Sequence, residues 1–363
     1  MDFELSDDQL ALRDGARELL DGLSAPAAVR AVVDAGGGLD RRLWDAMVEQ
    51  GWPAVALSEA DGGLGLGEVE IAVLLEELGR HAAPAPFAST VLALGALVDA
   101  AAVELAGRLL EGGVGCVAWS RRADAVVAES DGASTTLTGR ADPVPYAPSA
   151  TIAVVVGVER DAGEPALFAV DLDEHGRPPR EPAMDLTREV GWLVLDGTPA
   201  LRLGGQEAVM ALVDRGSTFA SAEMLGGAGR ALELAVDYAK DRVQFGRPIG
   251  SFQAVKHRCA DMLVDVEGMR STAYWAAWCI GAGDPDASVA ASTAKIWCSD
   301  ASKRVMASAL QVHGGIGFTW EHDLHLFLKR AQLDQLTFGD SSYHRERLAA
   351  LLRPRVESGA SVI

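Results

Sequence analysis

The hydrophobic and polar positions along the chain follow a helical period first, a strand-like pattern next, and a helical period again. In the first part, Leu12, Ala16 and Leu19 recur at helical spacing, and a strongly helical run follows the glycine-rich segment at 61–67. From about residue 112 the pattern changes to short runs rich in β-branched residues, separated by Gly, Pro and Asp-Gly turns. After residue 204 helical runs return and continue to a last pair from about Leu324 to Leu352.

This order predicts an α+β multidomain protein. We expect an N-terminal α-helical domain over residues 1–112, a middle β-domain over 113–204 and a C-terminal helical bundle over 205–363. The middle domain is predicted to be a small antiparallel barrel or sandwich. The long helices of the bundle are expected at 207–213, 217–241, 252–280 and 286–313.

Capping residues support several of these helix boundaries. Ser6 is a candidate N-cap, Gln9 three residues later completes a capping box, and Leu5 and Leu10 are placed to form a hydrophobic staple. In the bundle, the segments at 251–253 and 283–288 supply polar residues that we expect to cap the helices starting there.

Composition removes several classes of function. With 32 Lys and Arg against 52 Asp and Glu, the formal charge is −20, which disfavours binding to nucleic acid or to an anionic membrane. The longest apolar stretch, 91–110, is interrupted by charged residues, and the acidic N-terminus lacks the features of a signal peptide. Four cysteines without metal-ligand spacing indicate no metal site and a reducing, cytoplasmic location.

Three segments carry a resemblance that covers essentially the whole chain. They read DGGLGLGEVEIAVLLEELGRHAAPAPF at 61–87, AEMLGGAGRALELAVDYAKDRVQFGRPIGSFQAVKH at 222–257 and QVHGGIGFTWEHDLHLFLKRA at 311–331. In this order and spacing they resemble the acyl-CoA dehydrogenases, FAD enzymes that form an α,β double bond in a CoA thioester. The resemblance implies a helical N-terminal domain, a β-domain and a four-helix bundle. It also implies an acyl-CoA substrate and an electron acceptor such as electron-transfer flavoprotein.

The resemblance assigns FAD contacts to two segments of the bundle, and in the family these contacts reach the FAD of a neighbouring subunit. Arg242 would supply positive charge to the pyrophosphate, and Gly314 and Gly315 would let a backbone approach the cofactor closely because no Cβ intervenes. The full set of candidate residues is Arg242, Gln244, Phe245, Gln253, Gln311, Gly314 and Gly315. His313 is interpreted as a structural or cofactor-adjacent residue rather than an acid–base group.

The position of the usual catalytic base departs from the family pattern. Dehydrogenation needs a carboxylate within hydrogen-bond reach of the α-carbon, and most members supply it from a Glu just before a Gly. Here that position is Phe338, and the alternative position used by a minority of members falls at about Phe219. Glu223 and Asp340 remain as weak candidates for a base, and Glu223 is favoured as an ordinary helix-face residue.

The β-domain also departs from the family at the segments that contact a subunit's own flavin ring. The corresponding stretches here are 117–120 and 143–145, and the latter contains two prolines, which cannot donate backbone hydrogen bonds. The resemblance therefore points to the degenerate subunit of an α2β2 heterotetramer, as in members that act on steroid side chains. Two alternatives stay open: a self-sufficient homotetramer that uses Glu223 or Asp340, and a non-catalytic acyl-CoA-binding or scaffold protein.

Overall fold

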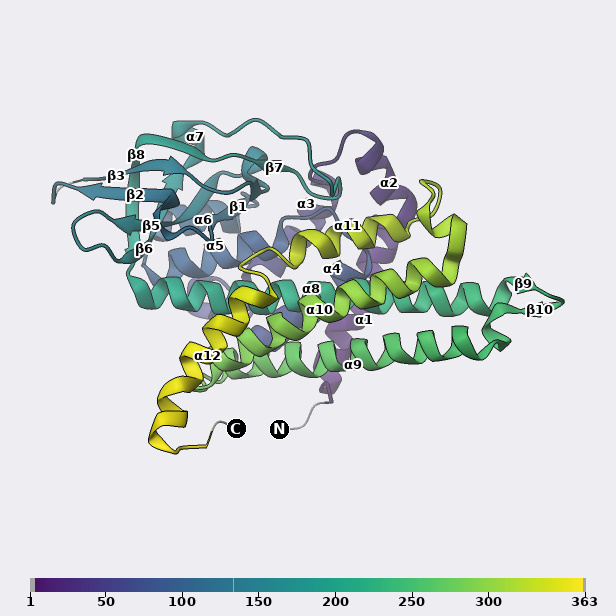
Figure 1. The fold of residues 1–363 in the computed structure, drawn as a ribbon. Helices are drawn as coiled ribbons and strands as arrows, with labels where there is room; N and C mark the ends of the chain where they lie inside the picture. Colours follow the sequence, from purple (N-terminus) through teal and green to yellow (C-terminus); the bar gives the residue numbers. More distant parts are fainter. Residues whose placement is uncertain (1–3, 133, 362–363) are drawn as a thin grey trace. The chain divides into compact units, whose positions relative to one another are not determined.

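The computed structural model describes residues 4–132 and 134–361, and they form two compact units. One unit comprises Met1–Ala28, Glu68–Ala83 and Ser217–Ile363, and the other comprises Val29–Gly67 and Pro84–Gly216. Along the chain, helices extend to Leu110, strands occupy 115–204, and helices continue from Gln206 (Figure 1). This order confirms the predicted fold class.

The unit that holds 29–67 and 84–216 contains a small barrel. Its strands are β1 (Gly115–Ala118), β2 (Val126–Ser130), β3 (Thr135–Arg140), β5 (Ile152–Glu159), β6 (Pro165–Asp171) and β8 (Val194–Gly204). The pairings run β5-β6-β8-β3-β2 and return to β5. Strands β1 and β2 share one edge of β5: β1 pairs with its first half, and β2 pairs with its end. The ring of strands is therefore closed.

The expectation of an antiparallel barrel is wrong in one respect. Strands β1 and β2 both pair with β5 in parallel, and the other pairings within the barrel are antiparallel. The run of β-branched residues identifies a strand but carries no information on the direction of its neighbour, so the sequence pattern could not reveal this.

The same unit also contains helices, of which α5 makes the most contact with the barrel. They are α3 (Arg41–Glu49), α5 (Phe87–Asp99), α6 (Val103–Leu110) and the short α7 (Leu172–His175), and α2 (Pro26–Asp34) joins the two units in sequence. Helix α5 packs closely on β1, because a Cβ at Gly115 would lie 2.7 Å from the Cβ of Ala93. The hydroxyl of Thr90 also accepts a hydrogen bond from the Gly115 N–H at 3.1 Å. Glycine is therefore required at this contact.

The other unit consists of helices. They are α1 (Asp7–Leu23), α4 (Glu68–Arg80), the part of α8 (Gln206–Asp241) after residue 216, α9 (Gln253–Gly281), α10 (Ala287–His313), α11 (Leu324–Asp334) and α12 (Ser341–Ser358). The predicted capping box at Ser6 and Gln9 is confirmed. Helix α8 is one continuous helix rather than the two expected, because a single glycine such as Gly216 costs only about 1 kcal/mol inside a helix.

The expected caps of α9 and α10 are wrong. Phe252 occupies the N-cap position of α9 and Asp286 that of α10, and neither makes a side-chain cap hydrogen bond. The Asp286 N–H instead donates to the Asp284 carboxylate at 2.8 Å, and the Asp286 carboxylate is paired with Arg355. Tertiary ion pairing thus replaces the local cap.

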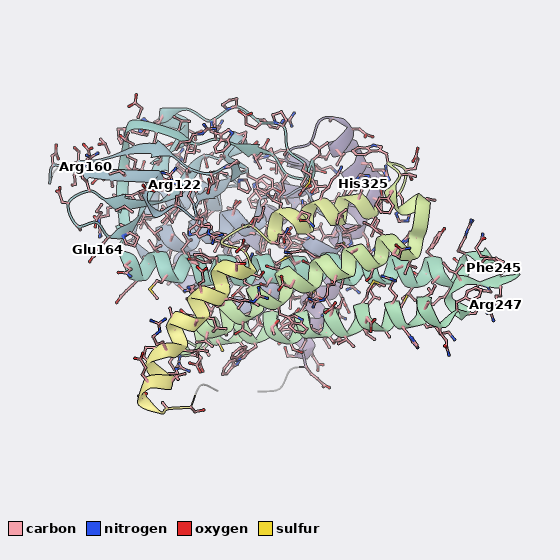
Figure 2. All side chains as sticks on the ribbon, in the orientation of Figure 1. Arg122, Arg160, Glu164, Phe245, Arg247 and His325 are labelled. Carbon is pink, nitrogen blue, oxygen red and sulfur yellow. The ribbon has the colours of Figure 1, made fainter. Side chains whose placement is uncertain are left out.

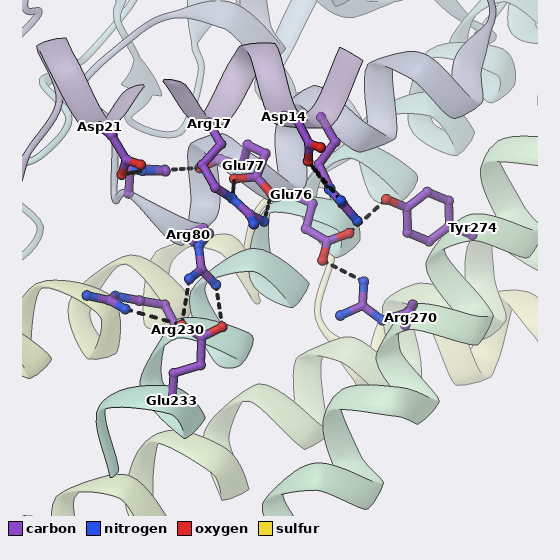
Figure 3. A network of polar contacts seen from close by, with 12 residues as sticks. Asp14, Arg17, Asp21, Glu76, Glu77, Arg80, Arg230, Glu233, Arg270 and Tyr274 are labelled. Carbon is purple, nitrogen blue, oxygen red and sulfur yellow. Dashed lines mark hydrogen bonds and ion pairs between the residues drawn. The ribbon is translucent and has the colours of Figure 1, made fainter. Parts of the chain in front are cut away.

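The EELGR motif at 76–80 explains how α4 is held among three other helices (Figure 3). Glu77 is buried and accepts two hydrogen bonds from Arg17 of α1, at 2.6 and 3.0 Å. Glu76 accepts from Arg270 at 2.6 Å and from the hydroxyl of Tyr274 at 2.7 Å, both on α9. Both arginines are partly exposed, so solvent screens these ion pairs and each contributes less than a fully buried pair would.

The same motif binds α8 through charge and through close backbone packing. Arg80 donates to both carboxylate oxygens of Glu233 at 2.6 Å. A Cβ at Gly79 would lie 2.0 Å from the Glu223 carbonyl oxygen, and one at Gly226 would lie 1.8 Å from the Glu76 carbonyl oxygen. The two helices therefore touch backbone to backbone, which only glycine permits. This contact therefore fixes the backbone of α8 at Glu223 against α4.

Candidate functional site

The first candidate segment forms a tight hairpin at the end of α8. Strands β9 (Val243–Gln244) and β10 (Arg247–Pro248) pair antiparallel, and the turn residues Phe245 and Gly246 have φ values of 52° and 76°. Both values belong to the left-handed region, which a non-glycine residue rarely adopts. Phe245 is nevertheless 91% exposed at the tip of the hairpin (Figure 2). A strained and exposed aromatic residue is a feature of functional sites.

The ring of Phe252, one residue before α9, packs against two side chains of this hairpin. The Arg247 guanidinium lies 4.2 Å from the centre of the Phe252 ring, and the Phe245 ring meets Phe252 edge-on at 6.1 Å between centroids. Gln253 begins α9 directly after it and is exposed. Arg247 and Phe245 therefore both pack on the Phe252 ring.

The second candidate segment follows the last turn of α10. Gln311 is exposed, His313 ends the helix, and the 3₁₀ turn η6 (Gly314–Phe318) follows. Gly314 has a φ of 62°, and a Cβ built on Gly314 or on Gly315 would meet no atom within 4 Å. The backbone of both glycines is therefore accessible to a molecule from outside the chain.

A ring contact brings the two segments together. Tyr238, four residues before Arg242 on α8, stacks on His313 with 4.7 Å between centroids and 25° between the planes. The Tyr238 carbonyl oxygen also accepts from the Arg242 N–H at 2.8 Å. We call the seven residues Arg242, Gln244, Phe245, Gln253, Gln311, Gly314 and Gly315 the exposed end of the bundle.

The exposed end fits the pyrophosphate of a dinucleotide. Within the described part of the chain, the side chains of Arg242 and Gln244 have no hydrogen-bond or ion-pair partner, so they are available to an external group. A free guanidinium beside uncovered glycine backbone is the combination that binds an anion. Nothing in the packing of this end conflicts with the FAD contacts that the resemblance implies.

The turn at the position of the usual base is held from two sides. The His344 Nε2–H donates to the Phe338 carbonyl oxygen at 2.9 Å, and Lys295 Nζ donates to the Gly339 carbonyl oxygen at 2.8 Å. Lys295 also donates to the carbonyl oxygens of Asp334 and Gln335, at 3.0 and 2.9 Å. Both polar side chains are fully buried, and burial lowers the pKa of Lys295 to about 7 and that of His344 to about 3.

The backbone of this turn is unusual at both residues. Phe338 has a φ of 57° and Gly339 a φ of 97°, and a Cβ at Gly339 would lie 2.3 Å from Cδ1 of Tyr343. The Phe338 side chain is buried, with the residue 8% exposed. A phenyl ring thus occupies this position, and it cannot take a proton.

The two carboxylates that remained as candidates each have structural partners. Glu223 is buried against Arg330 at 2.9 Å, and Arg330 also donates to the Ala83 carbonyl oxygen at 2.9 Å. Glu223 thus compensates the charge of a buried guanidinium, which is a structural role. Asp340 is the N-cap of α12, where it accepts the Tyr343 N–H at 2.9 Å. Phe219 is buried and apolar.

The stretches that would contact the flavin ring lie in the β-rich unit. Val117 and Ala118 are buried in β1, and the hydroxyl of Ser120 accepts the Asp142 N–H at 2.9 Å. Pro145 lies in β4 (Val144–Pro145), which pairs with β7 (Val190–Gly191). The Ser120 hydroxyl is thus already bonded within the unit.

Sequence reasoning missed the residues that organise these sites. Lys295 and His344 carry no motif, because their partners are backbone carbonyl groups 39 to 44 and six residues away. Tyr238 lies one helical turn before Arg242, and only the contact with His313 shows its importance. No group of His, Cys, Asp or Glu that could hold a metal occurs in the described ranges. Over the same ranges, no helix has the length and apolar character needed to cross a membrane.

Comparison with known proteins agrees with this picture over nearly the whole chain. The model of the acyl-CoA dehydrogenase N-terminal domain matches residues 6–115, and that of the C-terminal domain matches residues 204–352. The acyl-CoA dehydrogenase IpdE2 of Mycolicibacterium smegmatis is 33% identical over 355 residues, which cover 95% of this chain and 99% of the relative.

Two solved structures are similar at the same level. A chain of the ChsE4-ChsE5 complex from Mycobacterium tuberculosis has a TM-score of 0.90 and 30% identity, covering 97% of this chain and 99% of its own. A variant of the Tcur3481-Tcur3483 steroid ACAD has a TM-score of 0.88 and 32% identity, with coverage of 97% and 99%. The chain belongs to the acyl-CoA dehydrogenase family, whose members are oxidoreductases that act on the CH–CH bond of acyl-CoA thioesters.

Proposed function

We propose that this chain is the subunit without a catalytic base in a heteromeric, FAD-dependent acyl-CoA dehydrogenase. The observation that carries the proposal is the state of the turn at Phe338 and Gly339. Its backbone is held by Lys295 and His344, but its side chain is a buried phenyl ring. The exposed end, in contrast, keeps its polar side chains and uncovered glycines.

In this role the chain completes the FAD site of a homologous partner subunit. Arg242 would place its guanidinium on the pyrophosphate, and Gly314 and Gly315 would let the backbone N–H groups approach the same dinucleotide. Gln244, Gln253 and Gln311 would add polar contacts. Bound FAD supplies the acceptor for the hydride that leaves the β-carbon of the thioester. The carboxylate that removes the α-proton would come from the partner.

The substrate and the other partners follow from relatives. One similar structure is described as a steroid ACAD and another as a complex of two proteins, ChsE4 and ChsE5. We therefore assign a CoA thioester of a bulky, polycyclic acyl group as substrate and an α2β2 heterotetramer as assembly. Electron-transfer flavoprotein is the proposed electron acceptor. The four cysteines are free thiols, which is consistent with the proposed location in the reducing cytoplasm.

Co-expression tests the proposal. The chain would be produced alone and together with a homologue that carries the Glu at the base position, and each preparation would be assayed for bound FAD and for dehydrogenation of acyl-CoA. We expect flavin and turnover only in the co-expressed complex. Turnover by the chain alone would establish the homo-oligomeric alternative. A chain that binds acyl-CoA but never flavin, in any combination, would establish a non-catalytic binding protein.

A further inference from the structure

The two segments of the exposed end come from different helices, and one aromatic side chain connects them. Arg242, Gln244 and Phe245 follow α8, whereas Gln311, Gly314 and Gly315 belong to α10 and the turn after it. The stack of Tyr238 on His313 is the ring contact that joins the ends of these two helices, at 4.7 Å between centroids. This pair therefore contributes to the spacing of the two segments, together with the core packing of Ala239 and Leu310.

His313 is itself fixed in orientation. Its Nδ1–H donates to the Ala309 carbonyl oxygen at 2.8 Å, and the His322 ring meets it at 4.5 Å and 62°. A Cβ at Gly317 would lie 2.9 Å from the His313 Cβ, so η6 also packs tightly against it. With one ring face on Tyr238, a bonded Nδ1 and a second ring at its side, His313 has little freedom to move.

Tyr238 is held to the other segment through the backbone. Its carbonyl oxygen accepts the Arg242 N–H at 2.8 Å, and the Arg242 carbonyl oxygen accepts the Ile249 N–H at 2.8 Å after the hairpin. The backbone at Tyr238 is thus bonded to that of Arg242, which in turn closes the hairpin at Ile249. The Tyr238 hydroxyl makes no hydrogen bond to a residue that the structure describes, so the ring, not the hydroxyl, makes this link.

We propose that Tyr238 is a positioning residue for the FAD contacts of the exposed end, acting through His313. The proposal rests on the function proposed above. The Tyr238–His313 stack helps to set the spacing between Arg242 and the Gly314–Gly315 backbone before any cofactor arrives. An anion that must touch both segments at once is bound more tightly when their spacing is already correct, since no ordering cost remains to be met on binding.

The chain offers a matched control. Tyr343 and His344 form another Tyr–His ring contact, at 5.1 Å, on α12 and away from the exposed end. Tyr343→Ala removes the same side chain from another Tyr–His contact, which is edge-on at 82° rather than stacked. The rate at which this variant releases FAD therefore shows the effect of a general loss of packing in the bundle.

The experiment uses the co-expressed heteromer with bound FAD and measures the rate at which flavin fluorescence appears on dilution. We expect Tyr238→Ala to release FAD roughly 3- to 10-fold faster, as loss of one ring stack implies. Tyr238→Phe, which keeps the ring, should match the wild type, and so should Tyr343→Ala. Tyr238→Leu serves as a milder variant if the alanine protein does not fold, with the same direction of change expected.

Amide hydrogen exchange gives a readout that needs no cofactor. In the chain without flavin, Tyr238→Ala should accelerate exchange at 311–317 while Tyr343→Ala leaves this segment unchanged. The positioning role is wrong if Tyr238→Ala and Tyr343→Ala release FAD at equal rates, or if Tyr238→Phe is as impaired as Tyr238→Ala. Arg242→Ala distinguishes a wrong cofactor assignment from a wrong positioning role for Tyr238. If Arg242→Ala leaves the rate of FAD release unchanged, the assigned cofactor contacts are wrong. If Arg242→Ala accelerates release and Tyr238→Ala does not, only the positioning role of Tyr238 is wrong.

Discussion

Lys295 Nζ lies 2.8 Å from the carbonyl oxygen of Gly339, and the carbonyl oxygen of the preceding residue, Phe338, is bonded to His344. Two consecutive peptide groups are thus held by two buried side chains from α10 and α12. In most members of the family this turn carries the catalytic glutamate. In this chain the turn is therefore held firmly, and the side chain at position 338 is a phenyl ring.

Lys295 is important for stability because it donates to three carbonyl groups, an arrangement that we call the clamp. Lys295→Met removes the donor to three buried carbonyl groups, so we expect the free energy of unfolding to fall by about 3 kcal/mol. Urea unfolding at pH 7 measures this change. Lys303→Met on the same helix, which removes an exposed ion pair, is the control and should cost less than about 1 kcal/mol. Equal costs for the two variants would contradict the clamp.

Lys295 also predicts a dependence of stability on alkaline pH. Its pKa is lowered from 10.5 to about 7 by burial, so between these values the unfolded chain binds more protons than the folded chain. Stability should therefore rise with pH across this window, by up to about 1.4 kcal/mol per pH unit. The difference in unfolding free energy between wild type and Lys295→Met, measured from pH 7 to pH 10, isolates this contribution. A difference that stays constant would contradict the lowered pKa.

His344 makes stability depend on pH in the acidic range. Burial lowers its pKa from 6.5 to about 3, so the folded state holds it neutral while the unfolded state takes up a proton below pH 6.5. Its contribution is fully present above pH 6.5 and is lost as the pH falls towards 3. His344→Gln, which still has a donor for the Phe338 carbonyl, should lose less stability between pH 6.5 and pH 4.5 than the wild type. The check is chemical unfolding at these two pH values.

Glu223 and Asp340 should not behave as catalytic bases. Glu223→Gln removes the carboxylate charge from the buried ion pair with Arg330, so we expect a loss of up to about 3–5 kcal/mol in stability. Asp340→Asn should be nearly neutral, because asparagine is an equally good N-cap. At a temperature where both variants of the heteromer are folded and hold FAD, kcat should stay near that of the wild type. A loss of about a hundredfold at either position would identify a base in this chain.

Phe338→Glu should not restore a catalyst. The variant would place a carboxylate on this turn, but the stretches 117–120 and 143–145, which the resemblance assigns to the flavin ring, keep their departures from the family pattern, with Pro145 in the β4 pairing. Catalysis needs the base and the flavin on opposite faces of the same substrate. Assayed alone with acyl-CoA, the variant should show no turnover above the wild-type chain. Turnover approaching that of the heteromer would mean that the flavin-ring site is intact.

The cofactor contacts are tested by two substitutions in the exposed end. Arg242→Ala should weaken FAD binding by about 1.5–3 kcal/mol, the value of a charge-assisted hydrogen bond. Gly315→Val should also weaken it, and the open space at Gly315 means that the chain itself accommodates the side chain. Arg122→Ala, at an exposed arginine in the β-rich unit, is the control (Figure 2). Variants that melt lower but bind FAD with unchanged affinity would contradict the assignment.

The sequence revealed the fold class and most helices because their signals are local. The period of apolar positions, the capping box at Ser6 and the turn residues between strands each act within a few residues. The direction of the β1 and β2 pairings and the continuity of α8 through Gly216 depend on tertiary packing, and both predictions were wrong. The carbonyl partners of Lys295 and the ring partner of Tyr238 are equally non-local, so only the structure reveals them.

The central claim is that this chain lacks a working base and completes the FAD site of a partner. The most direct measurement is the visible spectrum of the chain purified alone, before and after addition of acyl-CoA, beside that of the co-expressed heteromer. We expect no flavin absorbance for the chain alone, and flavin that bleaches with acyl-CoA in the heteromer. A chain that alone carries a full complement of FAD and bleaches with acyl-CoA would contradict it.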